Sequence, residues 1–441
     1  MNAIKRNALP WLSLIWLSTA QGVDLISFYH DAVGYDAQYA SAKAALDAGR
    51  EALPQARAGL LPNIGLSANA MHNDVDYHRD SPSANISQKY KSNGWAVNLT
   101  QPLFRWDRFA NYGQAEARVA QAEAQFGLAR QDLIVRTAQA YFDVLQAQEA
   151  LSANEANKKA ISEQLDEAKR SFEVGTKTIV EVNDAQARFD LSVAQEIVAR
   201  NDLAVKNEQL RLLAGKGYDN LKNLRSGIEI SRPQPDNIDK WVSSAETGYF
   251  GVQAAQAQVD IQEKEVSKQR AGHLPSLDLV ASHGRNSQDS GAILTGFNDT
   301  TSTTIGVQLA IPLFSGGGVA SAVNQAAALK YKAAADLDNT RRTAALQARQ
   351  AYLGVVSGLS QVKALEAALV SSQSALDSNK LGFEVGVRTN IDVLNAQSQY
   401  FSTRQQLVKS RLDTLAALLK LKYAAGTLGE ADLAAINGLL E

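Results

Sequence analysis

The sequence offers few groupings of residues that could act chemically on a substrate. The chain has no cysteine, which excludes disulfides, thiolate metal sites and a cysteine nucleophile. Neither the GxSxG turn of serine hydrolases nor the GxxxxGK(S/T) phosphate loop is present. None of its histidines stands in the HExxH spacing of a zinc protease. We therefore expect no enzyme, no metal site and no cofactor. The scattered histidines are His30, His72, His78, His273 and His283.

Polar residues that could serve another purpose gather in two segments that nearly repeat each other. SFEVGTKTIVEVNDAQARFD occupies residues 171–190, and GFEVGVRTNIDVLNAQSQYF occupies residues 382–401. Gly175 and Gly386 take the same place in the two segments, at an offset of 211 (386 − 175). A helix that must stop and reverse favours glycine just past its end. Both segments are therefore predicted to be the tips of helical hairpins.

Hydroxyl and acidic residues follow each glycine at matching positions. Thr178 precedes Glu181 by three residues, and Thr389 precedes Asp392 by three. This is the spacing of a capping box, in which two side chains satisfy free N–H groups at the start of a helix. We expect each pair to start the returning helix of its hairpin.

Two further pairs of segments repeat at nearly the same offset. LPNIGLSANA (61–70) is similar to LPSLDLVASH (274–283), and AVNLTQPLF (96–104) is similar to GVQLAIPLF (306–314). Matched landmarks in the same order indicate an internal duplication. The predicted organisation is a first repeat at 23–214, an inter-repeat segment at 215–244, a second repeat at 245–428 and a tail at 429–441.

Each repeat contains one very long stretch without proline, at 106–174 and at 315–385. At 1.5 Å per residue each helix would be roughly 100 Å long, so it must lie along other helices. The helices that return from the tips carry larger residues every seven positions and small residues three positions later. This pattern favours close coiled-coil packing over an ordinary amphipathic bundle. The larger residues are Val182, Phe189, Leu203 and Leu210, interrupted by Glu196, and Val393, Tyr400, Leu407, Thr414 and Leu421; the small ones are Ala185, Ser192 and Ala199, and Ala396, Thr403, Ser410 and Ala417.

The segments before each long helix alternate apolar and polar residues. A strand pair is predicted at about 62–104, with a polar loop at 71–94, and a second at about 275–314, with a polar loop at 284–303. Such alternation fits a soluble sheet as well as transmembrane β-strands. Four short strands would leave two open edges, which hydrocarbon does not tolerate. In a membrane, several copies of the chain must therefore pool their strands.

The N-terminal residues have the pattern of a secretory signal. Lys5 and Arg6 precede an apolar core at 8–17, and small residues follow at 20–22. The core is too short to span a membrane, which disfavours the alternative of an anchored first helix. A signal peptide is predicted at 1–22. No later run approaches about 18 consecutive apolar residues, so no membrane-spanning helix is expected.

The tip GFEVGVRTNIDVLNAQ, the strand exits QPLF and IPLFSGGG, the LP strand entries and the closing LLKLKYAAGTL (418–428) resemble the TolC family of outer-membrane efflux and type I secretion channel proteins. The resemblance covers about residues 24–428, in both repeats and in order. It implies a mostly α-helical protein with a membrane β-barrel. In a homotrimer, the duplicated hairpins would form a periplasmic α-barrel. Four strands from each subunit would contribute to one shared twelve-stranded barrel in the outer membrane.

The resemblance also implies partners and a function. Members of the family conduct drugs or type I-secreted proteins outward, docked through a periplasmic adaptor onto an inner-membrane pump or ABC exporter. The absence of cysteine sets the chain apart from the lipid-anchored multidrug branch. The alternative is a periplasmic adaptor, which also carries a long helical hairpin, but only one. The net charge of −2 gives no indication of a nucleic-acid partner. The sequence does not identify the exported cargo.

In the family, the second hairpin tip lines the periplasmic entrance of the tunnel, and rings of acids constrict it. By motif match, Asp392 would be the ring carboxylate, and the second ring acid falls on Asn395, which is uncharged. The resemblance therefore implies weaker cation selectivity than in a member with both acids. The tips are also the expected adaptor-docking surface, with Gly175, Thr176, Lys177, Thr178, Gly386, Val387 and Thr389 as candidates.

The family also closes its entrance with links between the two hairpins. Arg388 matches the arginine of one link, and its partners fall on Glu181 and Val180. A charge-assisted contact between Arg388 and Glu181 is therefore an expectation. The tyrosine of a second link is replaced by Phe383, which has no hydroxyl, so that hydrogen bond cannot form.

Overall fold

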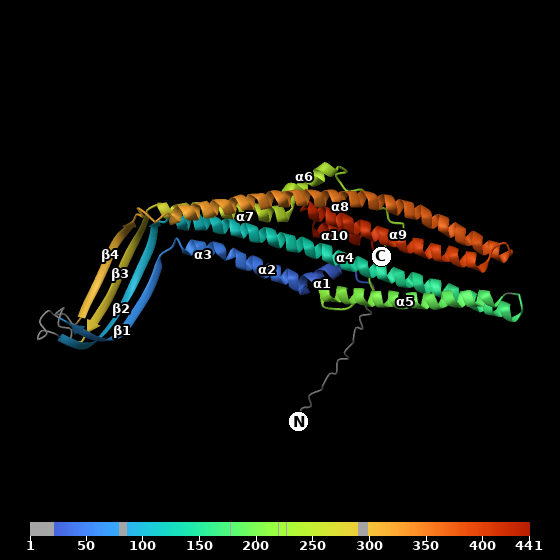
Figure 1. Ribbon diagram of the computed structural model, residues 1–441, viewed down its shortest axis with the longest axis horizontal. Helices are drawn as coiled ribbons and strands as arrows, with labels where there is room; N and C mark the ends of the chain where they lie inside the picture. Colours follow the sequence, from blue (N-terminus) through green and yellow to red (C-terminus); the bar gives the residue numbers. More distant parts are fainter. Residues whose placement is uncertain (1–21, 79–85, 177, 219, 226, 290–298) are drawn as a thin grey trace, which may run out of the picture. The chain divides into compact units, whose positions relative to one another are not determined.

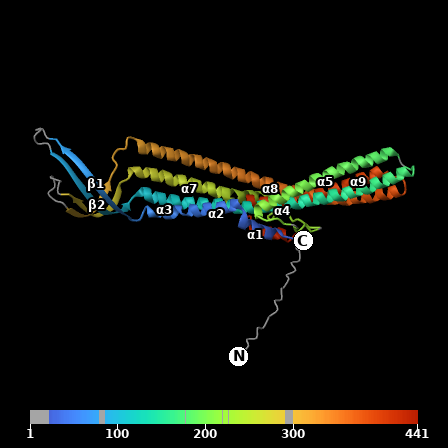
Figure 2. The same cartoon turned by 90° about the horizontal axis from the view of Figure 1, so that it is seen from below.

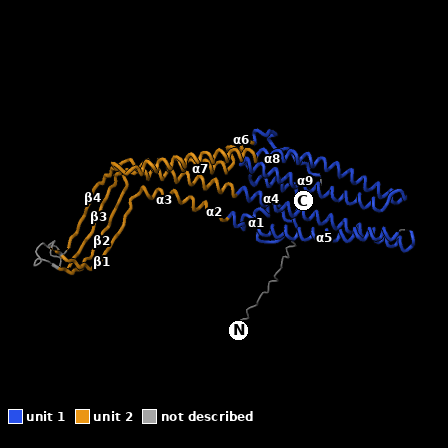
Figure 3. Tube along the Cα trace, viewed as in Figure 1, with its two compact units in different colours: residues 1–39, 130–241, 348–441 blue, residues 40–129, 242–347 orange. Residues whose placement is uncertain are grey.

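The computed structural model describes residues 22–78, 86–176, 178–218, 220–225, 227–289 and 299–441 (Figure 1, Figure 2). Apart from Gly22, the predicted signal peptide lies outside these residues. The chain folds into two compact units, and each contains segments of both repeats (Figure 3). Unit 1 comprises the residues up to Tyr39, Arg130–Trp241 and Ala348–Glu441, and unit 2 comprises Ala40–Ala129 and Val242–Gln347.

Unit 2 contains one four-stranded antiparallel sheet. Its strands are β1 (Asn63–Tyr77), β2 (Ile86–Phe104), β3 (Ser276–Gln288) and β4 (Asp299–Ala310). The spatial order is β1-β2-β3-β4, so the pairing of β2 with β3 joins the two repeats. Within the described residues, β1 and β4 each have a strand neighbour on one side only. The sheet is therefore open at both edges.

One face of this sheet is apolar and exposed. Ile64 lies opposite Leu99, and Leu99 lies opposite Ala281. Ala281 in turn lies opposite Ile305, so one apolar row crosses all four strands. Ile64 is 67% exposed and Ile305 is 75% exposed. The alternation read from the sequence is confirmed, and the register aligns the apolar side chains on a single face.

The opposite face is lined by small polar residues. Gly65 lies opposite Asn98, and Asn98 lies opposite Ser282. Ser282 lies opposite Thr304, which completes a second row across the sheet. Because successive side chains of a strand point to opposite faces, this row belongs to the other side from the apolar one.

A buried ion pair fixes the corner where β2 leads into a helix. Arg105 follows β2 directly, and its Nε and Nη2 donate to Asp278 of β3, at 3.1 Å to Oδ1 and 2.5 Å to Oδ2. Asp278 is buried and lies on the small polar face, two positions before Val280 and four before Ser282. A bidentate contact satisfies both carboxylate oxygens, so this acid is neutralised where it stands.

The strands are longer than the sequence predicted. β1 continues to Tyr77 and β2 begins at Ile86, so the polar loop expected at 71–94 is wrong in extent. The loop expected at 284–303 is wrong in the same way, since β3 and β4 extend into it from both ends. Ladder hydrogen bonds join backbone groups whatever the side chains are, so polar residues continue an antiparallel hairpin beyond its apolar band.

Four long helices form the two hairpins, and the long helices predicted at 106–174 and 315–385 are confirmed. The long helices are α4 (Trp106–Glu173), α5 (Ile179–Ala214), α8 (Gly318–Glu384) and α9 (Asn390–Ala424). The shorter elements are α1 (Leu25–Tyr35), α2 (Ala37–Arg50), α3 (Ala52–Ala58), α6 (Ile238–Gly248), α7 (Phe250–Arg270), the 3-10 turn η2 (Ala271–His273) and α10 (Glu430–Asn437).

In unit 1, α5 returns along α4 and α9 returns along α8 (Figure 1, Figure 2). Most of the small residues of the seven-residue pattern are buried, in agreement with the coiled-coil prediction: Ala185, Ser192 and Ala199 in α5, and Thr403 and Ser410 in α9. Ala396 and Ala417 are half-buried. Glu196 interrupts the pattern of larger residues and is nevertheless buried. Lys158 of α4 forms an ion pair with it, and this contact lowers the pKa of Glu196. The interruption is therefore a charged pair across the hairpin.

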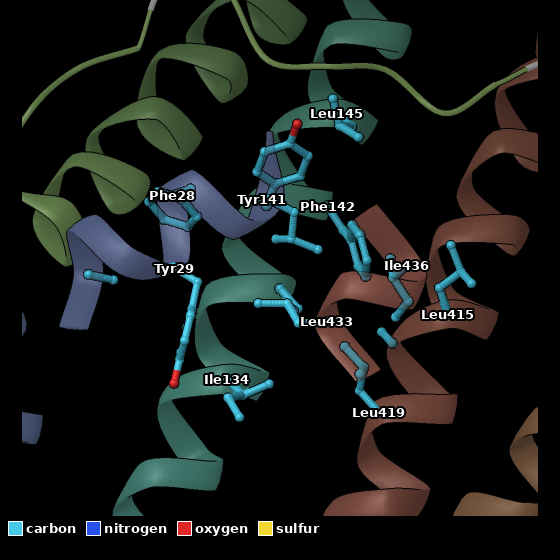
Figure 4. Close-up of a cluster of buried hydrophobic side chains, with 14 of the residues drawn as sticks. Phe28, Tyr29, Ile134, Tyr141, Phe142, Leu145, Leu415, Leu419, Leu433 and Ile436 are labelled. Atoms are coloured by element: carbon cyan, nitrogen blue, oxygen red, sulfur yellow. The ribbon is translucent and has the colours of Figure 1, made fainter. Parts of the chain in front are cut away.

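The apolar core of unit 1 forms where α1 and α10 pack on α4 and α9 (Figure 4). Each fully buried large side chain contributes about 1.5–3 kcal/mol relative to its exposure to water. The side chains that meet there include Phe28, Ile134, Tyr141, Leu415, Leu419, Leu433 and Ile436.

Tyr141 also ties two irregular segments to this core. Its hydroxyl lies 2.9 Å from the carbonyl oxygens of Val23 and Lys222 and donates its proton to one of them. Burial raises the pKa of Tyr141, so the hydroxyl remains a donor. Val23 forms a parallel bridge with Leu221, which fixes the first described residues against the inter-repeat segment.

One helix departs from the expectation that no helix could span a membrane. α8 contains an 18-residue window of mean hydropathy 1.3, which has the length and composition of a membrane span. Only 11% of this window is buried. Composition alone does not distinguish a span from a helix that packs on others, and α8 forms a hairpin with α9 through the ion pair of Glu366 with Arg411, 2.6 Å.

Candidate functional site

The first hairpin tip closes with a Schellman turn. The Thr176 N–H donates to the Ser171 carbonyl, and the Gly175 N–H donates to the Phe172 carbonyl, both at 2.9 Å. These two bonds satisfy carbonyl groups that the end of α4 would otherwise leave free. The backbone can reverse here because Gly175 adopts the left-handed conformation, with φ of 76°.

The second tip repeats the same turn at the end of α8. The Val387 N–H donates to the Gly382 carbonyl at 2.9 Å, and the Gly386 N–H donates to the Phe383 carbonyl at 3.0 Å. Gly386 has a φ of 82°, and a side chain in this conformation costs roughly 1–2 kcal/mol. Both glycines therefore stand in the left-handed turns that the sequence predicts at the ends of the long helices.

The returning helix of the second hairpin starts with the predicted capping box. The Asp392 N–H donates to the Thr389 hydroxyl at 3.3 Å. In return, the Thr389 N–H and hydroxyl donate to Asp392 Oδ2, at 2.9 and 2.8 Å. The two side chains therefore satisfy each other and the free N–H groups of the first turn.

The first hairpin lacks the capping box expected there. Thr178 has the extended backbone of an N-cap, but its side chain makes no capping hydrogen bond. The Glu181 N–H donates to the Thr178 carbonyl at 3.2 Å, a bond that the second tip also has, between Asp392 and Thr389 at 3.1 Å. The prediction for this pair is wrong. The first turn of α5 is held by this backbone bond without help from the Thr178 hydroxyl.

The capping contacts keep Asp392 charged. The backbone N–H of Thr389 lowers the pKa of Asp392 most, followed by the Thr389 hydroxyl, and the positive charge of Arg388 adds to this. A carboxylate with a lowered pKa is ionised throughout the neutral range. The second tip therefore presents a fixed negative charge at the start of α9.

Arg388 does not make the contact expected from the resemblance. Its Cγ lies 2.6 Å from the point that a Cβ on Gly382 would occupy, so its side chain folds back over its own hairpin. No ion pair joins Arg388 to Glu181, both of which the structure describes. Within this single chain the stem of Arg388 lies against the turn of its own tip, and the Arg388–Glu181 link stays a prediction for the assembled channel.

The other predicted tip residues lie at or beside the two turns. Phe383 is half-buried at the end of α8, and Val180 is 70% exposed in the first turn of α5. Lys177 falls outside the described residues. The valines beside the glycines are strongly exposed, with Val174 at 75% and Val387 at 76%. Each tip therefore combines an apolar surface with a rigid turn.

Asn395 has a partner that sequence reasoning missed. Nη1 of Arg188 in α5 donates to Asn395 Oδ1 in α9 at 3.2 Å, which joins the two hairpins one turn from Asp392. The only local signal was the spacing of Asp184 and Arg188, which form an i,i+4 ion pair at 3.1 Å. That spacing indicates a solvated helix face, and it does not indicate a contact with another helix.

Among the residues that the structure describes, no group of three or more His, Asp or Glu side chains could hold a metal ion. A sheet with an apolar exposed face and open edges, joined to duplicated helical hairpins, defines the class of outer-membrane channels with a periplasmic extension.

The comparisons agree with this class. The model of the family described as "Outer membrane efflux protein" matches residues 29–216 and 241–427. The chain belongs to the outer membrane efflux protein family.

Relatives match over nearly the whole chain. The chain is 33% identical over 422 residues to the outer membrane protein TolC of Vibrio cholerae, and this match spans 95% of this chain and 94% of that protein. It is 30% identical to the alkaline protease secretion protein AprF of Pseudomonas aeruginosa, which covers 97% of this chain and 90% of the relative. The protein is therefore an outer-membrane channel of the kind used in efflux or type I secretion, and the adaptor alternative is excluded.

Solved structures confirm the predicted fold class. The CmeC outer membrane channel of Campylobacter jejuni superposes with a TM-score of 0.80 at 18% identity, covering 100% of this chain and 98% of that one. The VceC outer membrane protein of Vibrio cholerae superposes with a TM-score of 0.77 at 20% identity, covering 91% and 96%.

The two tips provide a matched test of capping. Thr389→Ala removes the N-cap of α9 and should destabilise its first turn by about 1 kcal/mol. Thr178→Ala removes no capping bond and should change the start of α5 little. Amide hydrogen exchange of residues 390–393 and 179–182 measures both, and equal acceleration at the two tips would show that the asymmetry is absent in solution.

Proposed function

We propose that three copies of this chain assemble into one channel that crosses the outer membrane and continues through the periplasm. The observation that carries the proposal is the sheet of unit 2, which is open at both edges and has one apolar face. Hydrocarbon solvates the apolar face, but it offers no partner to the backbone groups of β1 and β4. Pairing β1 of one copy with β4 of the next satisfies those groups.

The proposed number of copies follows from how many strands a barrel needs to enclose an aqueous pore. Two copies would supply eight strands, and the interior of a barrel of about eight strands is filled by its own side chains. Three copies of four strands give twelve, which leaves room for an aqueous path. The small residues of the second row, such as Gly65 and Ser282, suit a water-filled lumen.

The exposed surface of α8 supports the same assembly. Its most apolar window is 11% buried in the single chain. Large side chains of α8 are also exposed, such as Tyr331 at 84% and Leu353 at 55%. Surfaces of this kind are covered by a partner when they lie outside a membrane. Neighbouring hairpins would cover it in a closed α-barrel.

The tips are the proposed docking surface for a periplasmic adaptor, which would connect the channel to an inner-membrane pump or ABC exporter. Val174, Val385 and Val387 are 75%, 65% and 76% exposed beside rigid turns, which is a surface that a partner can cover without reordering the backbone. Similarity to a protease secretion protein and to TolC supports export of proteins as well as of small molecules.

Asp392 is the proposed ion-selecting group at the entrance. Three copies of its carboxylate around one axis would attract cations and repel anions, and a narrow pore strengthens this effect. Asn395, one turn further along α9, adds no charge. Arg388 would act indirectly, because its positive charge favours the ionised form of Asp392.

The first test concerns assembly. The purified full chain in detergent should crosslink as a trimer and conduct ions in planar lipid bilayers, because only the closed assembly has a lumen. Dissociated monomer from the same preparation should be silent and serves as the control. A native sample that remains monomeric and leaves the bilayer without current contradicts the proposal.

The second test concerns selectivity. Asp392→Asn keeps an oxygen to accept from Thr389 but removes the charge, so the cation-to-anion permeability ratio should fall about twofold. Because the pKa of Asp392 is lowered from its ordinary value, the carboxylate stays charged as pH falls from 7 to 5 and is protonated only at more acidic pH. Reversal potentials in salt gradients should therefore not change between pH 7 and pH 5 in the wild type.

Asp202→Asn, which removes an exposed carboxylate of α5 away from the tips, is the matched control and should leave the ratio unchanged. A wild-type selectivity that titrates between pH 7 and 5, or an unchanged ratio in Asp392→Asn, would assign the selectivity to other groups.

The third test concerns docking and uses the absence of native cysteine. A cysteine introduced at an exposed tip position, as Thr176→Cys or Val387→Cys, should crosslink to a periplasmic adaptor in native cells, identified by mass spectrometry. Arg211→Cys, an exposed site near the other end of α5, should give no such product. Equal crosslinking of the adaptor at all three positions, or no crosslinking at the two tip positions, contradicts docking at the tips.

A further inference from the structure

Basic residues gather at the end of the sheet of unit 2 that leads into the helices (Figure 1). The segments that surround this end are 54–62, 101–111, 267–278 and 311–321. With histidine counted as neutral, they contain five basic and two acidic residues, which gives a formal net charge of +3 (5 − 2). We call the basic residues the basic rim; they are Arg57, Arg105, Arg108, Lys268 and Arg270.

The opposite end of the sheet has no such excess. Its described segments are 71–78, 86–93, 283–289 and 299–303. They contain three basic and four acidic residues, which gives a formal net charge of −1 (3 − 4). Lys89 pairs with Asp74 at 2.8 Å, and Arg285 pairs with Asp299 at 2.9 Å. In the described segments, the positive charge therefore belongs to one end of the sheet.

The basic rim borders the first turn of α4 on two sides. On one side, Arg108 Nη1 lies 3.2 Å from the point that a Cβ on Gly59 would occupy, just past the end of α3. On the other side, Nε1 of Trp106 donates to Oγ of Ser267, in the last turn of α7, at 3.2 Å. The cations of α3 and of α7 therefore lie on either side of this turn.

Part of this positive charge has no counter-charge in the chain. Asp107 lies 3.6 Å from Arg108, and both side chains are about half exposed, so this pair compensates the charge only weakly. Neither Arg57 nor Arg270 forms an ion pair with another described residue, and both are exposed. Both stand in the last turns of helices, where free carbonyl groups favour a cation. Their position alone therefore does not indicate a ligand.

The neighbourhood of the basic rim supplies that indication. Phe104, Leu277 and Leu309 form a row of the apolar face directly before the rim. Trp106 follows Phe104 by two residues and is 45% exposed. Aromatic rings with one polar group are typical of the level of the lipid headgroups. From the sheet toward the helices, the surface is therefore apolar, then aromatic, then positively charged.

A lipid leaflet has the matching order of hydrocarbon, interface and phosphate. The chain is an outer-membrane channel whose helices extend into the periplasm, so this end of the sheet meets the periplasmic leaflet. Phosphate groups accept strong hydrogen bonds from arginine, and anionic lipids attract clusters of basic residues. We infer that the basic rim binds the phosphate groups of anionic phospholipids in the periplasmic leaflet. The inference requires that the sheet cross the outer membrane, and it does not depend on the number of copies.

Two tryptophans provide a local readout at the two ends of the sheet. Trp95 and Trp106 are 42% and 45% exposed, whereas Trp241, the other tryptophan after residue 22, is buried. Trp95 lies opposite Arg285, beyond the apolar row and away from the helices. Lipids with brominated acyl chains quench the fluorescence of a tryptophan that they contact. Trp95→Phe therefore reports on the basic rim, and Trp106→Phe reports on the opposite end.

The test uses the purified full chain in bilayers in which either phosphatidylglycerol or phosphatidylcholine is brominated. In Trp95→Phe, phosphatidylglycerol should bind beside Trp106 at least about fivefold more tightly than phosphatidylcholine. In Trp106→Phe, the two lipids should bind beside Trp95 about equally. Arg108→Gln and Arg270→Gln, each added to Trp95→Phe, should lower the preference about fivefold, the scale of one basic residue beside an anionic lipid surface.

Two further variants separate charge from structure. Arg270→Lys keeps the positive charge, so the preference for phosphatidylglycerol should remain. Arg342→Gln is the matched control, because Arg342 is an exposed cation of α8 outside the basic rim that pairs with Asp338 at 2.7 Å. It should leave the preference unchanged. A loss of the preference in Arg270→Lys or in Arg342→Gln would assign the effect to altered structure and would overturn the inference.

The remaining outcomes separate the basic rim from the proposed channel. Equal preferences beside Trp95 and Trp106, or a preference that survives both glutamine variants, contradict binding at the rim. A neighbouring copy that covers the rim would exclude the lipid and abolish the preference, which also overturns the inference. Ion conductance is measured on the same samples. Conductance without a lipid preference overturns the rim alone, whereas a lipid preference without conductance supports the rim and overturns the channel.

Discussion

The backbone groups along the outer edges of β1 and β4 have no partner strand in the described chain, and this constraint governs how the rest can be used. In hydrocarbon each unsatisfied group costs several kcal/mol, whereas in water the apolar row from Ile64 to Ile305 would be exposed. Neither solvent suits the single chain. Closure with further copies satisfies the edges and leaves the apolar row to lipid. The exposed surface of α8 follows the same logic, because a long helix gains stability only from neighbours.

The duplication supplies two hairpins whose glycine turns are alike, whereas the first turns of their returning helices, α5 and α9, differ. The turns are equal because the left-handed glycine and its two hydrogen bonds depend on a few adjacent residues. The starts differ, since Asp392 completes a capping box and Glu181 does not. A carboxylate held by its own cap has a fixed position and a lowered pKa, as Asp392 has. The second hairpin is therefore the one suited to present a permanent charge to a passing ion.

What could be predicted from the sequence was local or strictly periodic. The glycine turns, the long helices and the two faces of the strands follow from residues within a few positions of one another. The failures concern distances across the fold. The Arg188–Asn395 bond depends on how each helix is rotated about its axis, and a shift of one residue turns a side chain by about 100°. The strands were predicted too short for another reason. The change from apolar to polar residues marks the edge of the membrane band, whereas the backbone hydrogen bonds between the strands continue beyond it.

In the proposed assembly, the small polar face of the sheet must turn toward the lumen, because the apolar face turns toward lipid. On that face, in the strands as described, Asp278 is the one charged residue, and Arg105 neutralises it. Arg285 and Asp299 pair with each other at 2.9 Å on the apolar side, beyond its apolar row. A lumen lined without net charge does not discriminate between anions and cations. In this proposal, discrimination by charge is left to the hairpin tips, where the lowered pKa of Asp392 keeps its carboxylate ionised.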